Sequence, residues 1–168
     1  KDGAGKNINL WQLQTHLSYT IPLMHKMHLQ FVGGGILKLP FQQPFFTRQL
    51  FGYGDIYLQG LEYYVIDGVA GGVVRTLVSK QVASFFVNTH LKSKIYNKIP
   101  FRFYLKAYNN EGYAYNPLPG NSLLNNKLLS TYGLGLDIVT IYDLSFKIEY
   151  SFNQFGGQGV FIHTGTDF

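Results

Sequence analysis

The stretch LSFKIEYSFN, residues 144–153, alternates apolar and polar side chains without a break. Its apolar set is Leu144, Phe146, Ile148, Tyr150 and Phe152, and its polar set is Ser145, Lys147, Glu149, Ser151 and Asn153. Successive side chains of a β-strand point to opposite faces of the sheet, so a period of two predicts a strand. Residues 144–153 therefore predict a strand with one apolar face and one polar face.

The same alternation recurs along the chain. It predicts six further strands, at about residues 11–21, 27–39, 68–84, 101–115, 132–138 and 160–168. Short reversals are expected at Pro22-Leu23 and Tyr142-Asp143, and long connections at residues 40–67 and 116–128. Short and long connections thus alternate along the chain, and the connection at residues 86–98 is an exception. Helical periodicity is not evident anywhere, so we expect an all-β fold of about seven antiparallel strands.

The composition limits where such a sheet can exist. Of the 168 residues, 46% are hydrophobic and 14% are charged, whereas soluble domains carry about 25% charged residues. No stretch approaches the roughly 20 apolar residues of a membrane helix. A chain with few charges, many aromatic residues and alternating strands is typical of a transmembrane antiparallel β-barrel. The net charge of +5 is scattered, so no nucleic-acid partner is expected.

Alternation alone does not tell which face of the sheet meets lipid. The polar faces of the best strands carry charges of both signs, which we expect to form a network inside the barrel: Arg102, Lys106, Asp137, Lys147 and Glu149. The opposite faces carry aromatic residues near strand ends, as in the aromatic girdles of membrane barrels. The alternative is a soluble carrier of the lipocalin type, which would hold its apolar face inside.

Seven strands do not make a bacterial single-chain barrel, because such barrels have an even number. We therefore expect residues 1–168 to be a single domain that forms the C-terminal part of a larger barrel, with a long extracellular or lumenal loop at about residues 40–67. The alternative is a complete barrel of eight strands, one of which the pattern fails to reveal.

Three stretches resemble a known family. Residues 56–68, IYLQGLEYYVIDG, resemble the end of the conserved inner loop of the BamA/TamA outer-membrane protein assembly superfamily, particularly its Bacteroidota-type members. Residues 133–143 and 150–163 resemble the last strands of that family, and Phe168 resembles the C-terminal signal of outer-membrane proteins. The resemblance implies a 16-stranded barrel, a long loop folded into the lumen, upstream periplasmic POTRA domains and a location in the outer membrane of a Gram-negative-type bacterium.

The resemblance also implies a function. Members insert or secrete proteins through a lateral seam, which here would involve the last strand, with Val160, Ile162 and Phe168. The implied partners are outer-membrane lipid, nascent outer-membrane proteins or secreted clients, and accessory lipoproteins. An unpaired strand edge is a template for adding further strands, which gives the seam its physical basis. The alternative is a structural or pore-type barrel without insertase activity.

The loop motif, Leu58-Gln59-Gly60-Leu61, departs from the family pattern. Where the family has arginine this chain has Gln59, and where it has tyrosine or phenylalanine this chain has Leu61; Gly60 is shared. A neutral amide forms weaker hydrogen bonds than a guanidinium. We therefore expect a looser anchor for the loop and an activity that diverges from that of the family.

No enzyme, cofactor or metal site is predicted. Asp137 and Glu149 have Lys147 and Arg102 near them, which favours a structural ion network over an acid/base pair. His25 and His28 lie near a turn on opposite sides of a strand, and the other histidines, His16, His90 and His163, are interpreted as lumenal or turn residues. The glycines at 33–35 lack the helix and lysine of a phosphate-binding loop, so they suggest a kink or a point of close packing.

Overall fold

The computed structural model describes residues 9–52, 56–88, 98–141 and 144–165. Seven strands form one antiparallel sheet in the order β1-β2-β5-β6-β7-β8-β9. Their bounds are Trp11–Pro22 (β1), Met27–Leu39 (β2), Ala70–Asn88 (β5), Lys98–Tyr115 (β6), Leu128–Val139 (β7), Ser145–Asn153 (β8) and Gln158–Thr164 (β9). The predicted all-β fold with seven antiparallel strands is confirmed.

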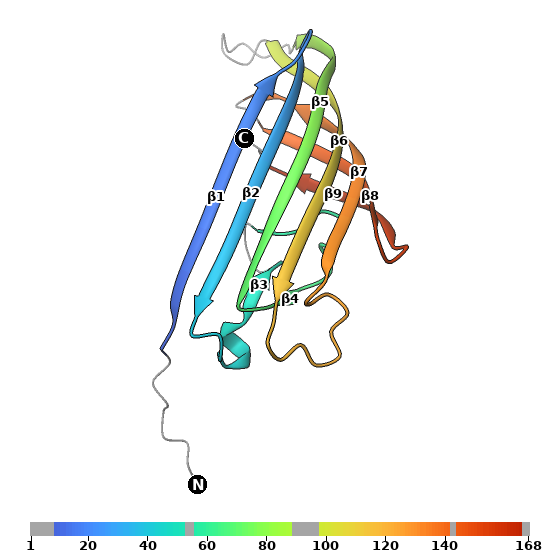
Figure 1. Cartoon of the computed structure of the whole chain (residues 1–168). Helices are drawn as coiled ribbons and strands as arrows, with labels where there is room; N and C mark the ends of the chain where they lie inside the picture. Colours follow the sequence, from blue (N-terminus) through green and yellow to red (C-terminus); the bar gives the residue numbers. More distant parts are fainter. Residues whose placement is uncertain (1–8, 53–55, 89–97, 142–143, 166–168) are drawn as a thin grey trace.

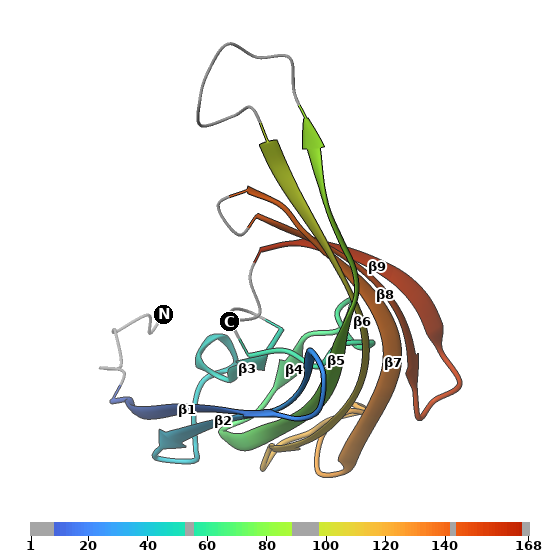
Figure 2. The same ribbon diagram turned by 90° about the horizontal axis from the view of Figure 1, so that it is seen from above.

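The sheet is strongly curved and open, with β1 and β9 as its two edges (Figures 1 and 2). Each strand pairs with the next long strand along the chain, so the topology is a simple meander. Seen from above, the segment between β2 and β5 lies on the concave side of the curve (Figure 2). We call residues 40–67 the inner loop.

The inner loop contains regular structure that alternation did not predict. A short 3₁₀ helix, η1 (Phe45–Thr47), is followed by β3 (Gln49–Phe51), which pairs antiparallel with β4 (Ile66–Asp67). Apolar side chains of the loop form the buried core together with residues on the concave face of the sheet. This core contains Ile36, Leu50, Phe51, Ile56, Leu58, Leu61, Ile66, Val73, Ala114 and Leu129.

Several expected strand ends were placed too early or too late. β5 and β6 are longer than predicted, because Phe85 pairs with Phe101 and the ladder continues to Asn88 and Lys98. The first reversal is not limited to Pro22-Leu23: β1 includes Pro22, and Leu23 donates a backbone hydrogen bond to Met27. The expected turn at Tyr142-Asp143 lies outside the described residues.

The two faces of the sheet differ in chemistry: the convex face exposes apolar residues, whereas the concave face buries polar residues next to the apolar core. On the convex face, apolar residues are exposed: Leu105, Leu134, Ile148 and Ile162 range from 43% to 71%. On the concave face, polar residues are buried: Gln30, Lys38, Lys106, Asn110, Thr131, Ser145, Lys147, Glu149 and Ser151. In the middle of β6, β7 and β8, period-two alternation thus places apolar side chains on the convex side and polar ones on the concave side.

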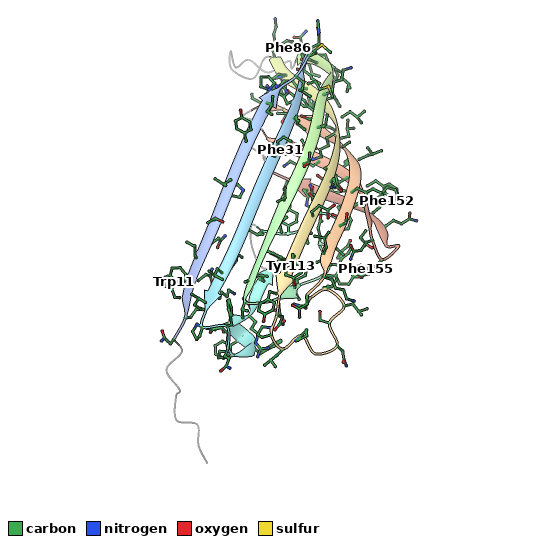
Figure 3. All side chains as sticks on the ribbon, viewed as in Figure 1. Trp11, Phe31, Phe86, Tyr113, Phe152 and Phe155 are labelled. Carbon is green, nitrogen blue, oxygen red and sulfur yellow. The ribbon has the colours of Figure 1, made fainter. Side chains whose placement is uncertain are left out.

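Several exposed aromatic residues lie towards the ends of this sheet, although exposed Phe31 lies between the ends (Figure 3). Trp11, Tyr113 and Phe155 lie at a similar height towards one end, and Phe86 lies at the other (Figure 3). Within the described part of the chain, no helix is long and apolar enough to cross a membrane.

Candidate functional site

The candidate site is the polar part of the concave face, where β6, β7 and β8 lie side by side. The register sets Lys106 opposite Gly135, which in turn is opposite Glu149. The adjacent row contains Tyr108, Gly133 and Ser151. In both rows a glycine on β7 separates two longer side chains on β6 and β8.

These glycines allow direct contact across the middle strand. The Lys106 ammonium lies 2.6 Å from Glu149 Oε1 and 2.7 Å from Asp137 Oδ1. A Cβ atom added to Gly135 would lie 2.7 Å from Lys106 Cε, so any side chain there would obstruct this path. Tyr108 and Ser151 form a hydrogen bond between their hydroxyl groups across Gly133 in the same way.

The apex of the inner loop reaches this cluster. Gln59 is 1% exposed, and its Nε2 donates to both carboxylate oxygens of Glu149 at 3.0 Å. Asn110 donates to the backbone oxygen of Gln59 at 3.5 Å, and Asn153 donates to that of Gly60 at 3.2 Å. The apex is therefore held by side chains from both β6 and β8.

The other residues of the loop motif, Leu58, Gly60 and Leu61, explain why the inner loop can lie so close to the sheet. Gly60 has a φ of +86°, a backbone conformation that favours glycine. A Cβ atom at Gly60 would lie 3.0 Å from the Ser151 Cβ atom. Leu58 packs against Gly112 on β6, and Leu61 is buried in the apolar core.

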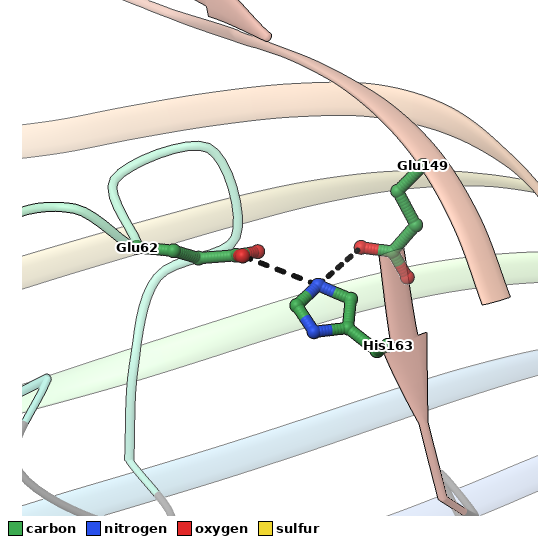
Figure 4. Close-up of side chains that lie close together, drawn as sticks. All are labelled: Glu62, Glu149 and His163. Atoms are coloured by element: carbon green, nitrogen blue, oxygen red, sulfur yellow. Dashed lines mark ion pairs between the residues drawn. The ribbon is translucent and has the colours of Figure 1, made fainter. Parts of the chain in front are cut away.

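A second group of titratable residues adjoins the loop apex. His163 Nε2 lies 3.2 Å from Glu62 Oε2 and 3.8 Å from Glu149 Oε2 (Figure 4). Burial raises the pKa of the Glu62 carboxyl above its usual range, and the charge of the neighbouring His163 opposes part of that shift. The inner loop, β8 and β9 each contribute one residue to this group.

The five residues predicted as an ion network all lie on the concave face. Ion pairs join Lys106 to Asp137 and to Glu149. Lys147 is 5% exposed and pairs with Asp137 in the register. Arg102 lies on the same face of β6 as Lys106, with Tyr104 between them on that face. The structure thus brings together three of the five by ion pairing and places the other two beside them.

The residues assigned to the last strand are on the opposite face. Val160 and Ile162 are exposed on the convex side of β9, which is an edge of the sheet. The strand itself spans Gln158–Thr164 rather than residues 160–168. Phe168 lies outside the described residues.

The contributions of Glu62 and His163 to the site were not anticipated from the sequence. The alternation along β9 could have indicated the position of His163, because His163 pairs with Lys147 and therefore lies on the same face of the sheet. Glu62 gave no such signal, because it lies in the inner loop outside any alternating stretch.

The comparisons with known proteins add no relative: no family model, curated protein or solved structure matches this chain.

Proposed function

We propose that this chain contributes seven strands to a larger transmembrane β-barrel of the outer membrane, in an assembly or translocation factor similar to the BamA/TamA superfamily. The barrel would insert or secrete proteins through a lateral seam that involves β9. In this arrangement the convex face meets lipid and the concave face lines the lumen, where the inner loop is anchored.

The observation that carries the proposal is the exposure of apolar side chains on the convex face together with the burial of charged and polar ones on the concave face. Leu134 is 59% exposed whereas Lys106 is 1% exposed, and the same contrast recurs along β6, β7 and β8. Exposed apolar surface on this scale is unfavourable in water but suits a bilayer. A soluble carrier of the lipocalin type would instead hold its apolar faces inside.

The position of the inner loop argues against a wide, open pore. Its motif, Leu58-Gln59-Gly60-Leu61, is buried against the sheet and is hydrogen-bonded to Glu149 and to Asn153. A loop fixed by specific contacts suits a barrel whose lumen is occupied by its own chain. The two unpaired edges, β1 and β9, leave room for the further strands and for a seam.

An arginine substitution tests the membrane location. We expect Leu134→Arg to lower the free energy of unfolding in lipid vesicles by about 2–4 kcal/mol, the cost of a charge near the bilayer midplane. The matched control is Leu123→Arg, at an exposed position in the loop after β6, where the expected change is within about 0.5 kcal/mol. Equal effects of the two substitutions, together with full-length protein that stays dispersed in water without detergent, would exclude the membrane location.

A reversible cross-link tests the seam. We expect that a disulfide between Val160→Cys on β9 and a cysteine on the first strand of the full-length barrel stops client assembly in cells, and that a reductant restores it. Normal assembly by the oxidised protein would favour the alternative, a structural or pore-type barrel in which the loop only braces the lumen.

A further inference from the structure

The group formed by Glu62, Glu149 and His163 has a geometry that the proposed assembly function does not require. The ligand atoms offered by the three side chains all lie within 4.8 Å of one another (Figure 4). Two of these separations are 3.2 Å and 3.8 Å, both measured from His163 Nε2. Ligand atoms bound to one Zn²⁺ ion at about 2.0–2.2 Å lie roughly 3–4 Å apart, so the three atoms are close to the spacing of a shared ion.

The hydrogen bonding around the group is incomplete. Gln59 Oε1 is buried and has no hydrogen-bond partner among the described residues. Gln59 is 1% exposed, and its carboxamide lies at the Glu149 carboxylate, to which its Nε2 donates. Buried polar atoms are almost always paired, so an unpaired oxygen beside three potential ligands indicates that the group binds something further.

We propose that Glu62, Glu149 and His163 bind a divalent transition-metal cation such as Zn²⁺. One imidazole nitrogen and two carboxylate oxygens form a ligand set that suits these ions. Mg²⁺ and Ca²⁺ prefer sites made of oxygen alone, so they should bind more weakly here.

The surroundings orient the ligands. Lys106 holds Oε1 of Glu149, which leaves Oε2 directed towards His163. Gln59 Nε2 fixes the same carboxylate from the loop side. Partners of this kind set the direction of a metal ligand and raise its affinity.

The rival explanation is that protonated His163 bridges the two carboxylates as a simple ion pair. The two explanations differ in what a lysine at this position would do. His163→Lys keeps a positive charge that can pair with Glu62 and Glu149, but it offers no imidazole. A metal site should lose its affinity in this variant, whereas an ion pair should survive.

A bound ion would join three segments that are far apart in the sequence. Glu62 belongs to the inner loop, Glu149 to β8 and His163 to the edge strand β9. The metal would therefore fasten the loop to the edge of the sheet. This proposal does not depend on the assembly function, because binding can be measured without any client.

The test is calorimetric titration of Zn²⁺ into full-length protein stripped with EDTA, repeated with Mg²⁺. We expect one Zn²⁺ ion to bind at this site and Mg²⁺ to bind more weakly. His163→Lys and Glu62→Gln should each lower the Zn²⁺ affinity by at least about 100-fold, the upper end of what loss of a supporting group alone costs. His28→Ala, on β2, is the control and should leave the affinity unchanged.

Thermal unfolding with and without Zn²⁺ is a second measurement, which also tests a variant that is less stable than the wild-type protein. Zn²⁺ should raise the unfolding midpoint of the wild-type protein and of His28→Ala, since a ligand that binds only the folded state stabilises it. It should not raise the midpoint of His163→Lys. Equal Zn²⁺ affinity in wild type and His163→Lys, or no binding to the wild-type protein, would overturn the proposal.

Discussion

Lys106 on β6 passes over Gly135 on β7 to reach Glu149 on β8. A Cβ atom at Gly135 would lie 2.7 Å from Lys106 Cε and 3.2 Å from the backbone oxygen of Ile148. The glycine therefore makes room for an ion pair between strands that are not neighbours.

The first prediction concerns the two glycines of β7. We expect Gly135→Ala and Gly133→Ala each to lower the free energy of unfolding by about 1–3 kcal/mol through overpacking. Gly133→Ala should be the more severe, because its Cβ would lie 2.6 Å from both the rigid Tyr108 ring and the Tyr150 backbone oxygen. The measurement is an equilibrium urea titration of the full-length protein. The control is Gly33→Ala on β2, where a Cβ atom meets nothing within 4 Å; equal losses at Gly33 and Gly133 would contradict the prediction.

The second prediction concerns the buried ammonium group. Lys106→Met leaves Asp137 and Glu149 without their shared cation, so we expect the free energy of unfolding to fall by about 3–5 kcal/mol. Lys127→Met, at an exposed position before β7, should change it by no more than about 0.5 kcal/mol. Both values come from the same urea titration. If the two variants were equally stable, the ion pairs of Lys106 would have no structural importance.

The third prediction concerns the loop anchor. Gln59→Ala removes two hydrogen bonds to a buried carboxylate, and bonds to charged groups contribute about 1.5–3 kcal/mol. We expect a loss of stability in that range and faster chymotrypsin cleavage at Tyr63 and Tyr64, which are exposed in the inner loop. The matched control is Gln42→Ala, an exposed glutamine of the same loop. Cleavage of Gln59→Ala at the wild-type rate would show that the loop is held by other contacts.

The fourth prediction separates backbone strain from packing at Gly60. Gly60 and Gly120 both have positive φ angles, +86° and +57°. Of these two glycines, only Gly60 would bring a Cβ atom close to a neighbour, the Ser151 Cβ atom at 3.0 Å. We expect Gly60→Ala to cost about 1–3 kcal/mol in the urea titration and Gly120→Ala less, because the latter has strain alone. The prediction fails if the order is reversed.

The sequence predicts the strands well wherever the alternation is long. Lys106, Asp137 and Glu149 could be assigned to one face of the sheet. The period of two tells which residues of a strand share a face, and the polar faces of strands joined in hairpins are expected on the same side. β3 and β4 could not be predicted, since strands of two or three residues are too short to show a period. Their pairing depends on the fold of the whole inner loop.

The Glu62–His163 contact could not be predicted from the sequence. The parity of β9 places His163 on the concave face, but only the path of the inner loop brings Glu62 within 3.2 Å of it. The loop path in turn depends on Gln59 reaching Glu149 and on Gly60 fitting against Ser151. Such contacts between distant segments follow from packing, which no local pattern encodes.

The contacts that skip a strand also have a mechanical meaning. Lys106 to Glu149 and Tyr108 to Ser151 tie β6 to β8 across β7, in addition to the backbone ladders. We expect these three strands to resist sliding past one another and to move as a rigid plate. Bending of the sheet should then be concentrated at the borders of the plate, where β5 meets β6 and where β8 meets β9.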